Sequence, residues 1–290
     1  MSNTQLIIEE REAKIGKFMV GRLLPFRKKR SVGPFVFIDH MGPADLAPGA
    51  GLDIGPHPHI GLSTLTFLFD GQIRHRDTTG ADQIIEPGAV NWMTAGSGVV
   101  HSERTPPHLF NQNKKLHGLQ IWVALPKEKE EIAPSFQHYE ADSIPAWQEG
   151  EVHYRLVAGS IEGKCSPVNV FSELYMLEIR ADQDAKIDIG SKLFGESGLY
   201  ILQGSICAEG HEYQSKQILI AEDATLCSFE IKAGSIVYIF GGEPFPEERF
   251  IYWNFVSSSR ERIEQAKQDW AEGRFDRVPG EDDLLPLPAY

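Results

Sequence analysis

The sequence predicts an all-β fold of two tandem β-barrels followed by a short C-terminal helix. Runs of alternating apolar, β-branched and aromatic residues recur along the chain, among them PFVFID, LSTLTFLF, GLQIWVAL and GLYILQGS. Clusters of Gly, Pro, Asn and Asp, such as GPADLAPGAG and TTGADQ, separate these runs at short intervals, as turns do in β-sandwiches and barrels. The strands do not alternate with helices, which argues against a parallel βαβ architecture.

A polar, Pro-containing stretch at residues 126–150 separates two strand-rich halves of similar layout. Domain boundaries usually fall in such segments, and 290 residues are more than one average core fills. We therefore expect an N-terminal barrel over residues 1–135, a second barrel over 150–256, and a helix with a tail over 257–290.

The predicted helix has a start signal, an apolar stripe and a stop signal. Ser258 and Glu261 have the spacing of a capping box, and Gly273 can end the helix in the left-handed conformation. One face carries Ile263, Ala266, Lys267 and Trp270, and we expect it to pack Trp270 onto a barrel. The residues that follow, 276–290, have no period and predict either an ordered arm or a loose tail.

The composition indicates which kinds of partner the protein can bind and in which cell compartment it works. The net charge of −13 repels phosphate backbones, and the basic cluster at residues 27–30 is too short to predict nucleic-acid binding. The three cysteines, Cys165, Cys207 and Cys227, have no paired spacing, which favours a reducing compartment. Without a signal-peptide pattern or a long apolar run, the sequence predicts a cytoplasmic protein that does not enter membranes. We expect a monomer.

Two short segments carry the chemistry-bearing residues. His57 and His59 are two apart, as are His101 and Glu103, so each pair can project to one face of a strand. Three imidazoles and one carboxylate suit a divalent first-row metal and leave coordination positions open for substrate or water. The alternative for any single histidine is a hydrogen-bonding residue at a strand end. We treat five further histidines as non-ligands: His40, His75, His108, His117 and His138.

Four stretches resemble the pirin family of bicupin proteins in the cupin superfamily: GPFVFIDHMGP, PHPHIGLSTLTFLFDG, PGAVNWMTAGSGVVHSE and HGLQIWVALP. The resemblance covers residues 20–125 closely, and GGEP with NFVSSS near residues 241–259 is similar to the C-terminal part of the family. It implies two stacked cupin-type barrels, each a double-stranded β-helix, with one metal in the N-terminal barrel. The implied metal ligands are His57, His59, His101 and Glu103.

The sequence departs from the general cupin pattern in two places. Ser63 stands where that pattern usually has a glutamate, but pirins take their carboxylate from the position of Glu103, so no ligand is lost. The C-terminal half contains no His-x-His pair. We therefore expect no metal in the second barrel.

The family resemblance implies a quercetin 2,3-dioxygenase-like activity on flavonols or similar enolic aromatics with O₂. The metal would bind the deprotonated 3-oxygen of the flavonol, and Glu103 would accept its proton. Iron(II) is the preferred metal, with Ni, Mn, Cu, Co and Zn left open. Candidate pocket residues, each of which could instead be barrel core or outer support, are Phe35, Phe37, Met93, His117, Gln120 and Trp122.

The family resemblance also implies an alternative function, because other pirins resemble regulators. This alternative is a metal-dependent, redox-sensing regulator that binds a transcription factor or a metabolic enzyme. This function needs a metal with one-electron chemistry, which zinc lacks. The charged segment at residues 127–131 is a candidate place for such a partner, although charge runs are usually just solvated.

Overall fold

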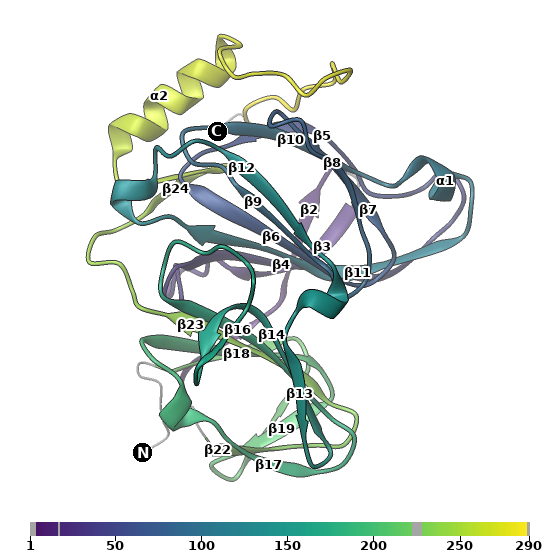
Figure 1. Ribbon diagram of the computed structural model, residues 1–290, viewed down its shortest axis with the longest axis vertical. Helices are drawn as coiled ribbons and strands as arrows, with labels where there is room; N and C mark the ends of the chain where they lie inside the picture. Colours follow the sequence, from purple (N-terminus) through teal and green to yellow (C-terminus); the bar gives the residue numbers. More distant parts are fainter. Residues whose placement is uncertain (1–3, 17, 222–227, 289–290) are drawn as a thin grey trace. The chain divides into compact units, whose positions relative to one another are not determined.

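The computed structural model describes residues 4–16, 18–221 and 228–288, and strands dominate them (Figure 1). The chain forms two compact units. We call residues 12–22, 37–141 and 246–290 the N-terminal barrel, and residues 1–11, 23–36 and 142–245 the C-terminal barrel. The prediction of an all-β fold with a C-terminal helix is confirmed.

This division differs from the three consecutive segments expected from the sequence. The first residues of the chain belong to the C-terminal barrel, and the last residues belong to the N-terminal barrel. Strand β1 (Thr4–Glu9) pairs antiparallel with β21 (Gln217–Ala221) and so belongs to the C-terminal barrel. At the other end, the amide of Leu285 donates to the carbonyl of Pro56 in the N-terminal barrel. Main-chain hydrogen bonds at strand edges thus attach each terminus to the barrel that the other half of the sequence builds.

The C-terminal barrel combines two antiparallel sheets around an apolar core. One sheet has the order β1-β21-β18-β23-β16-β14-β13, with β15 paired to β14, and the other has the order β17-β22-β19-β20. Buried Leu and Ile side chains such as Leu177, Leu199 and Leu219 fill the core. The strands are β13 (Ala146–Glu149), β14 (Val152–Ile161), β15 (Lys164–Cys165), β16 (Leu174–Ala181), β17 (Ala185–Asp188), β18 (Glu196–Gln203), β19 (Ser205–Ala208), β20 (His211–Gln214), β22 (Ser228–Ile231) and β23 (Ile236–Gly242).

The N-terminal barrel likewise has two main sheets. Their orders are β12-β9-β6-β11-β4-β3-β2 and β5-β10-β7-β8, and a small β24-β25 hairpin accompanies them. The strands are β2 (Arg11–Ile15), β3 (Phe18–Leu24), β4 (Phe35–Leu46), β5 (Asp53–His59), β6 (Leu62–Asp70), β7 (Ile73–Asp77), β8 (Asp82–Ile85), β9 (Val90–Thr94), β10 (Val99–Arg104), β11 (Lys114–Ala124), β12 (Ser135–Tyr139), β24 (Phe250–Tyr252) and β25 (Phe255–Ser257). Short helical segments are α1 (Pro107–Phe110) and the 3₁₀ turns Lys127–Lys129, Ala141–Ser143 and Gly190–Lys192.

The C-terminal helix α2 (Arg260–Ala271) begins one residue later than the capping-box prediction. Its N-cap is Ser259, whose hydroxyl accepts a hydrogen bond from the amide of Arg262 at 3.2 Å. Ser258 is not the cap because its amide and hydroxyl both donate to the buried carboxylate of Glu130. Gly273 has φ +68°, as predicted for the helix end.

The apolar stripe of α2 packs on the N-terminal barrel as expected. Ile263 and Ala266 are buried against Ile60 and Phe255, and Trp270 joins the edge of this cluster. The chain then runs beside β5 and β10 as an ordered segment, drawn in yellow in Figure 1. Of the two forms left open by the sequence, the structure therefore has the arm.

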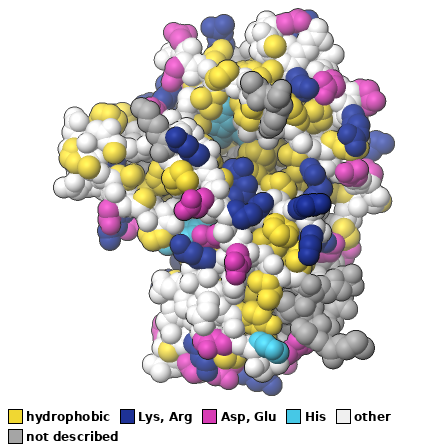
Figure 2. Space-filling view, turned by 180° about the vertical axis from the view of Figure 1, so that it is seen from behind, with side chains coloured by type: hydrophobic (Ala, Val, Ile, Leu, Met, Phe, Trp, Pro, Cys, Tyr) yellow, Lys and Arg dark blue, Asp and Glu magenta, His cyan; other side chains and the backbone are white. Residues whose placement is uncertain are grey.

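The surface carries both signs of charge, interspersed on the face drawn in Figure 2. Lys29 of the basic cluster is paired with Glu196 within the C-terminal barrel. Cys165 is exposed and Cys207 half-buried, both as free thiols, while Cys227 lies outside the described residues. Among the described residues, no helix is long and apolar enough to cross a membrane.

Candidate metal centre

Three histidines converge inside the N-terminal barrel. His57 and His59 lie on β5, and His101 lies on the neighbouring strand β10 directly opposite His57. One ring nitrogen from each lies within 4.8 Å of the others, and the Nε2 atoms of His59 and His101 are 3.0 Å apart. All three residues are buried, with at most 6% exposure. The two-residue spacing thus places both imidazoles of β5 on the same side of the strand, facing the third.

Backbone carbonyls orient the two β5 rings. The Nδ1–H of His57 donates to the carbonyl of Gly55 at 2.9 Å, and that of His59 donates to the carbonyl of Asn254 at 3.2 Å. A hydrogen bond at one ring nitrogen fixes the tautomer and leaves the Nε2 lone pair for a metal. Three buried imidazoles held in this way fit a divalent first-row metal.

His101 is supported by a second histidine and an aspartate on β7. Its Nδ1 lies 3.3 Å from Nδ1 of His75, and Nε2 of His75 is 2.8 Å from a carboxylate oxygen of Asp77. The ring of His75 also stacks on Phe136 at a centroid distance of 4.4 Å. Asp77 thus orients His75, and His75 in turn can accept the Nδ1–H of His101, as carboxylate–histidine pairs do around metals.

Burial sets the protonation of these groups. Desolvation lowers the pKa of His57 to about 4, and it holds the pKa values of His59 and His101 well below 6.5, with repulsion between the rings adding to the effect. The rings are therefore neutral near pH 7, as metal ligation requires. Burial raises the pKa of Glu103 to about 7.

Glu103 is not part of the three-histidine group, although it follows His101 on β10. The pairing of β10 with β5 shifts register between these two residues. The Glu103 carboxylate is 3.5 Å from the hydroxyl of Thr66, which also donates to the side-chain oxygen of Gln120 at 3.0 Å. The structure therefore brings together three of the four predicted ligands, and the ligand role of Glu103 stays a prediction.

Four of the expected pocket residues lie beside this centre. Trp122 presents its ring edge to His59 at a centroid distance of 5.2 Å and stacks on Phe37 at 3.9 Å. Met93 and Trp122 both pair with Thr64 across the sheet, so they stand on the same face. Gln120 reaches Glu103 through Thr66, as described above.

The structure places the other two expected pocket residues elsewhere. Phe35 is the first residue of β4, and this start of the strand is part of the C-terminal barrel, where the ring of Phe35 packs on Phe240. His117 is 2.8 Å from Nε2 of His40 and packs its ring on Phe69. Phe69 and Thr66 are three residues apart on β6, so their side chains point to opposite faces of the sheet. His40, Phe69 and His117 therefore lie on the face turned away from the three histidines.

Sequence reasoning missed His75, Asp77 and Thr66. The first two form a His-x-Asp pair on β7, with the same two-residue spacing as the pairs on β5 and β10. That spacing was an available signal, but the sequence alone did not show that β7 is the neighbour of β10. Thr66 lies in an apolar strand and carried no signal.

Comparison with known proteins agrees with this architecture. A family model described as pirin matches residues 17–123, and one described as the pirin C-terminal cupin domain matches residues 176–276. A pirin-like protein of Caulobacter vibrioides is 44% identical over 98% of this chain and 99% of its own length. These matches confirm the two cupin domains predicted from the sequence.

Solved structures extend the comparison. A crystal structure of quercetin 2,3-dioxygenase from Acinetobacter baumannii has a TM-score of 0.90 and 34% identity, covering 98% of this chain and 95% of that one. The bacterial pirin YhhW from Escherichia coli, solved in complex with nickel(II), shares the fold with a TM-score of 0.63 and 18% identity, covering 82% of this chain and 99% of that one. By the two family models and the relative that matches it almost end to end, the chain belongs to the pirin family.

Proposed function

We propose that this pirin is a metal-dependent dioxygenase of the quercetin 2,3-dioxygenase type, acting on flavonols or similar enolic aromatics with O₂. The observation that carries the proposal is the buried group of His57, His59 and His101, with a carboxylate on the same strand as His101. The similarity to the Acinetobacter enzyme over nearly the whole chain supports it.

The three histidines would hold the metal, and Glu103 is the proposed fourth ligand. When bound, the metal supplies Lewis acidity and, if it is iron, one-electron chemistry. Iron(II) is our proposed metal, although the same donors accommodate Ni, Mn, Cu, Co and Zn. The histidines contribute fixed, neutral rings, so the charge of the centre is set by the cation and the nearby carboxylate.

Glu103 is the proposed base for the enolic hydroxyl of the substrate. Thr66 lies between Glu103 and Gln120, and when it donates its single hydroxyl hydrogen to Glu103 it can hold the carboxylate in one orientation. A carboxylate that is buried but bonded only weakly to its neighbour is available to accept a proton from a bound hydroxyl.

Trp122 and Phe37 offer a place for the aromatic part of the substrate. Their rings are nearly parallel, at 14°, and the edge of Trp122 contacts His59. A flat aromatic ligand would meet a rigid apolar surface next to the histidines, while Gln120 supplies a polar group. We expect a small molecule as substrate and a monomeric protein in a reducing cytoplasm.

The experiment that tests the proposal is turnover of quercetin by protein reconstituted separately with Fe, Ni, Mn, Cu or Co. Loss of quercetin and release of carbon monoxide would be followed for the wild type, His59→Ala and His108→Ala. His108 is an exposed histidine on α1 and serves as the matched control. We expect turnover in the wild type and in His108→Ala and none in His59→Ala. Equal turnover in His59→Ala, or no carbon monoxide with any metal, would contradict the proposal.

A further inference from the structure

The strands that carry the centre have a second, outward-facing set of polar residues. On β10, His101 and Glu103 alternate with Ser102 and Arg104. On β7, His75 and Asp77 alternate with Arg74 and Arg76. Successive residues of a strand point to opposite faces, so the side chains that build the centre and those on the outer face share the same two strands.

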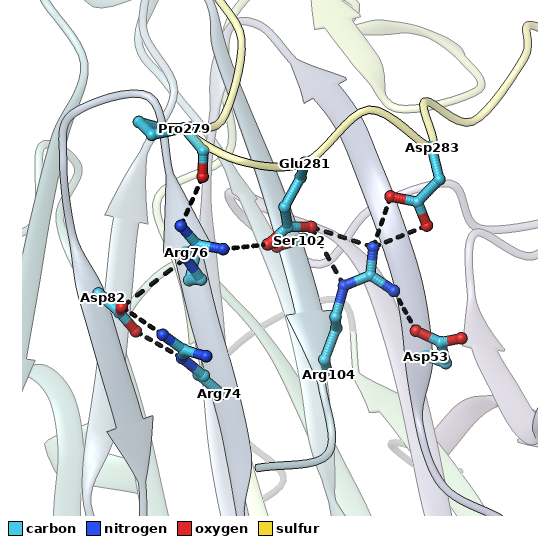
Figure 3. A network of polar contacts seen from close by, with 9 residues as sticks. All are labelled: Asp53, Arg74, Arg76, Asp82, Ser102, Arg104, Pro279, Glu281 and Asp283. Carbon is cyan, nitrogen blue, oxygen red and sulfur yellow. Dashed lines mark hydrogen bonds and ion pairs between the residues drawn. The ribbon is translucent and has the colours of Figure 1, made fainter. Parts of the chain in front are cut away.

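A single buried carboxylate of the C-terminal arm, residues 279–285, joins these outer side chains. One oxygen of Glu281 accepts from Ser102 at 2.7 Å and from Arg76 at 3.0 Å (Figure 3). The other oxygen accepts from Arg104 at 3.1 and 3.0 Å. Glu281 is only 8% exposed. It therefore ties β7 to β10 from behind the metal ligands.

The rest of the arm reaches β5, the strand of His57 and His59. The amide of Leu285 donates to the carbonyl of Pro56 at 2.9 Å. At Gly55 the arm lies so close that an added Cβ would stand 2.6 Å from the carbonyl oxygen of Asp283. The arm thus contacts all three strands that supply the histidines or their support.

Of the three carboxylates that pair with Arg104, that of Glu281 is the buried one. The side chains of Asp53 and Asp283, which also pair with Arg104, are 72% and 62% exposed, whereas that of Glu281 is 6% exposed. Exposed ion pairs contribute little, but removing one partner of a buried pair leaves the other charge uncompensated. Replacing Glu281 would therefore remove the one buried carboxylate that Arg76, Arg104 and Ser102 share, leaving the two arginines only their other partners.

A hollow of about 470 Å³ lies between the arm and the sheet. Its lining includes Arg74, Arg76, Arg104, Glu281, Asp282 and Asp283. Polar side chains rather than a continuous apolar contact therefore hold this part of the arm. A Gln at position 281 has nearly the same shape as Glu, so the substitution changes the charge without overpacking.

We propose that Glu281 is a positioning residue for the metal centre and that docking of the arm and binding of the metal are coupled. The backbone ladder sets the spacing of β7 and β10. Glu281 braces the outer side of both strands, and with it the approach of His101 and His75 to the other two rings. Coupling between two binding events is reciprocal, so the metal must in turn hold the arm more firmly. The inference rests on the proposed metal site and is independent of the proposed reaction.

The first test is the affinity and absorption spectrum of Co²⁺ in Glu281→Gln and in Asp282→Asn. Asp282 is the matched control, because it carries the same charge on the same arm but makes none of the ion pairs found among the described residues. We expect Glu281→Gln to bind Co²⁺ about 10- to 100-fold more weakly, with an altered spectrum, and Asp282→Asn to match the wild type. Equal affinity and spectrum in the two variants would overturn the proposal.

The second test measures the reverse effect by hydrogen exchange of the arm amides, including that of Leu285. Co²⁺ should slow this exchange in the wild type and not in His59→Ala. Exchange that is indifferent to Co²⁺ would overturn the proposal.

If Glu281→Gln does not fold, Ser102→Ala offers a milder variant. It removes one hydrogen bond to the same carboxylate and should also weaken Co²⁺ binding. Co²⁺ binding without quercetin turnover would defeat the proposed reaction alone, and a wild type that binds no Co²⁺ would defeat both proposals.

Discussion

The two barrels of this protein are built from similar antiparallel sheets but differ in one group of buried polar side chains. In the C-terminal barrel, buried polar side chains satisfy one another: the hydroxyl of Tyr238 donates to Glu178, and those of Tyr175 and Ser197 are 2.6 Å apart. In the N-terminal barrel, His57, His59 and His101 turn one nitrogen each toward a common point. Burying three imidazoles with their nitrogens turned to one another is costly unless they share a partner, so their burial indicates a site for something else.

The sharpest way to break this comparison is to remove one imidazole from each barrel. His59→Ala should abolish Co²⁺ binding, a larger effect than the roughly 10- to 100-fold loss expected for an outer partner of a ligand. His211→Ala, at an exposed histidine of the C-terminal barrel, should leave it unchanged. Calorimetric titration of both variants would measure the difference. Tight binding by His59→Ala would show that the three rings are not the site.

The next largest effect is expected from the core of the C-terminal barrel. Leu219 is fully buried, and Leu219→Ala should lower the free energy of unfolding by about 2–5 kcal/mol through lost contacts and a cavity. Urea denaturation would measure this loss. Co²⁺ affinity of the folded protein should not change, since this barrel supplies none of the ligands. A loss of Co²⁺ affinity in folded Leu219→Ala would contradict the assignment of the metal site to the N-terminal barrel alone.

Two histidine–aspartate pairs allow a finer comparison. Asp77→Asn removes the charge that orients His75 behind His101 and should weaken Co²⁺ binding about 10- to 100-fold. Asp182→Asn changes a similar 2.8 Å pair with His153 that is exposed on the C-terminal barrel, and it should have no effect. The same titration measures both. If Asp77→Asn also has no effect, the chain through His75 does not support the centre.

The smallest predicted effect concerns the start of α2, which packs on the N-terminal barrel. Ser259→Ala should cost about 1 kcal/mol of stability, because the amide of Arg262 loses its capping acceptor. Hydrogen exchange of α2 should rise accordingly, while exchange in the core of the C-terminal barrel stays unchanged. Unaltered exchange in α2 would show that Ser259 does not cap the helix.

The sequence predicts the features that depend on short-range pattern. Alternating apolar residues predict strands, and the two-residue spacing of His57 and His59 predicts rings on one side of β5. Gly273 predicts the helix end, whereas the start was misplaced by one residue because three serines stand in a row and Glu130, distant in sequence, engages Ser258. Only the tertiary contact decides which serine is the cap.

The features that the sequence did not predict depend on long-range pairing. Nothing local indicates that β1 pairs with β21 or that β7 lies beside β10, so the division of the chain and the role of His75 followed only from the structure. His117 is a different case: it lies three residues before Gln120 on β11, so strand alternation alone places these two side chains on opposite faces of the sheet.

Anomalous diffraction from crystals of the protein loaded with its native metal tests the central claim most directly. We predict one strong peak in the N-terminal barrel, bonded by His57, His59 and His101 at about 2.0–2.2 Å, and none in the C-terminal barrel. Crystals of metal-loaded protein with no peak between these three rings, or with the metal bound elsewhere in the chain, would contradict the account.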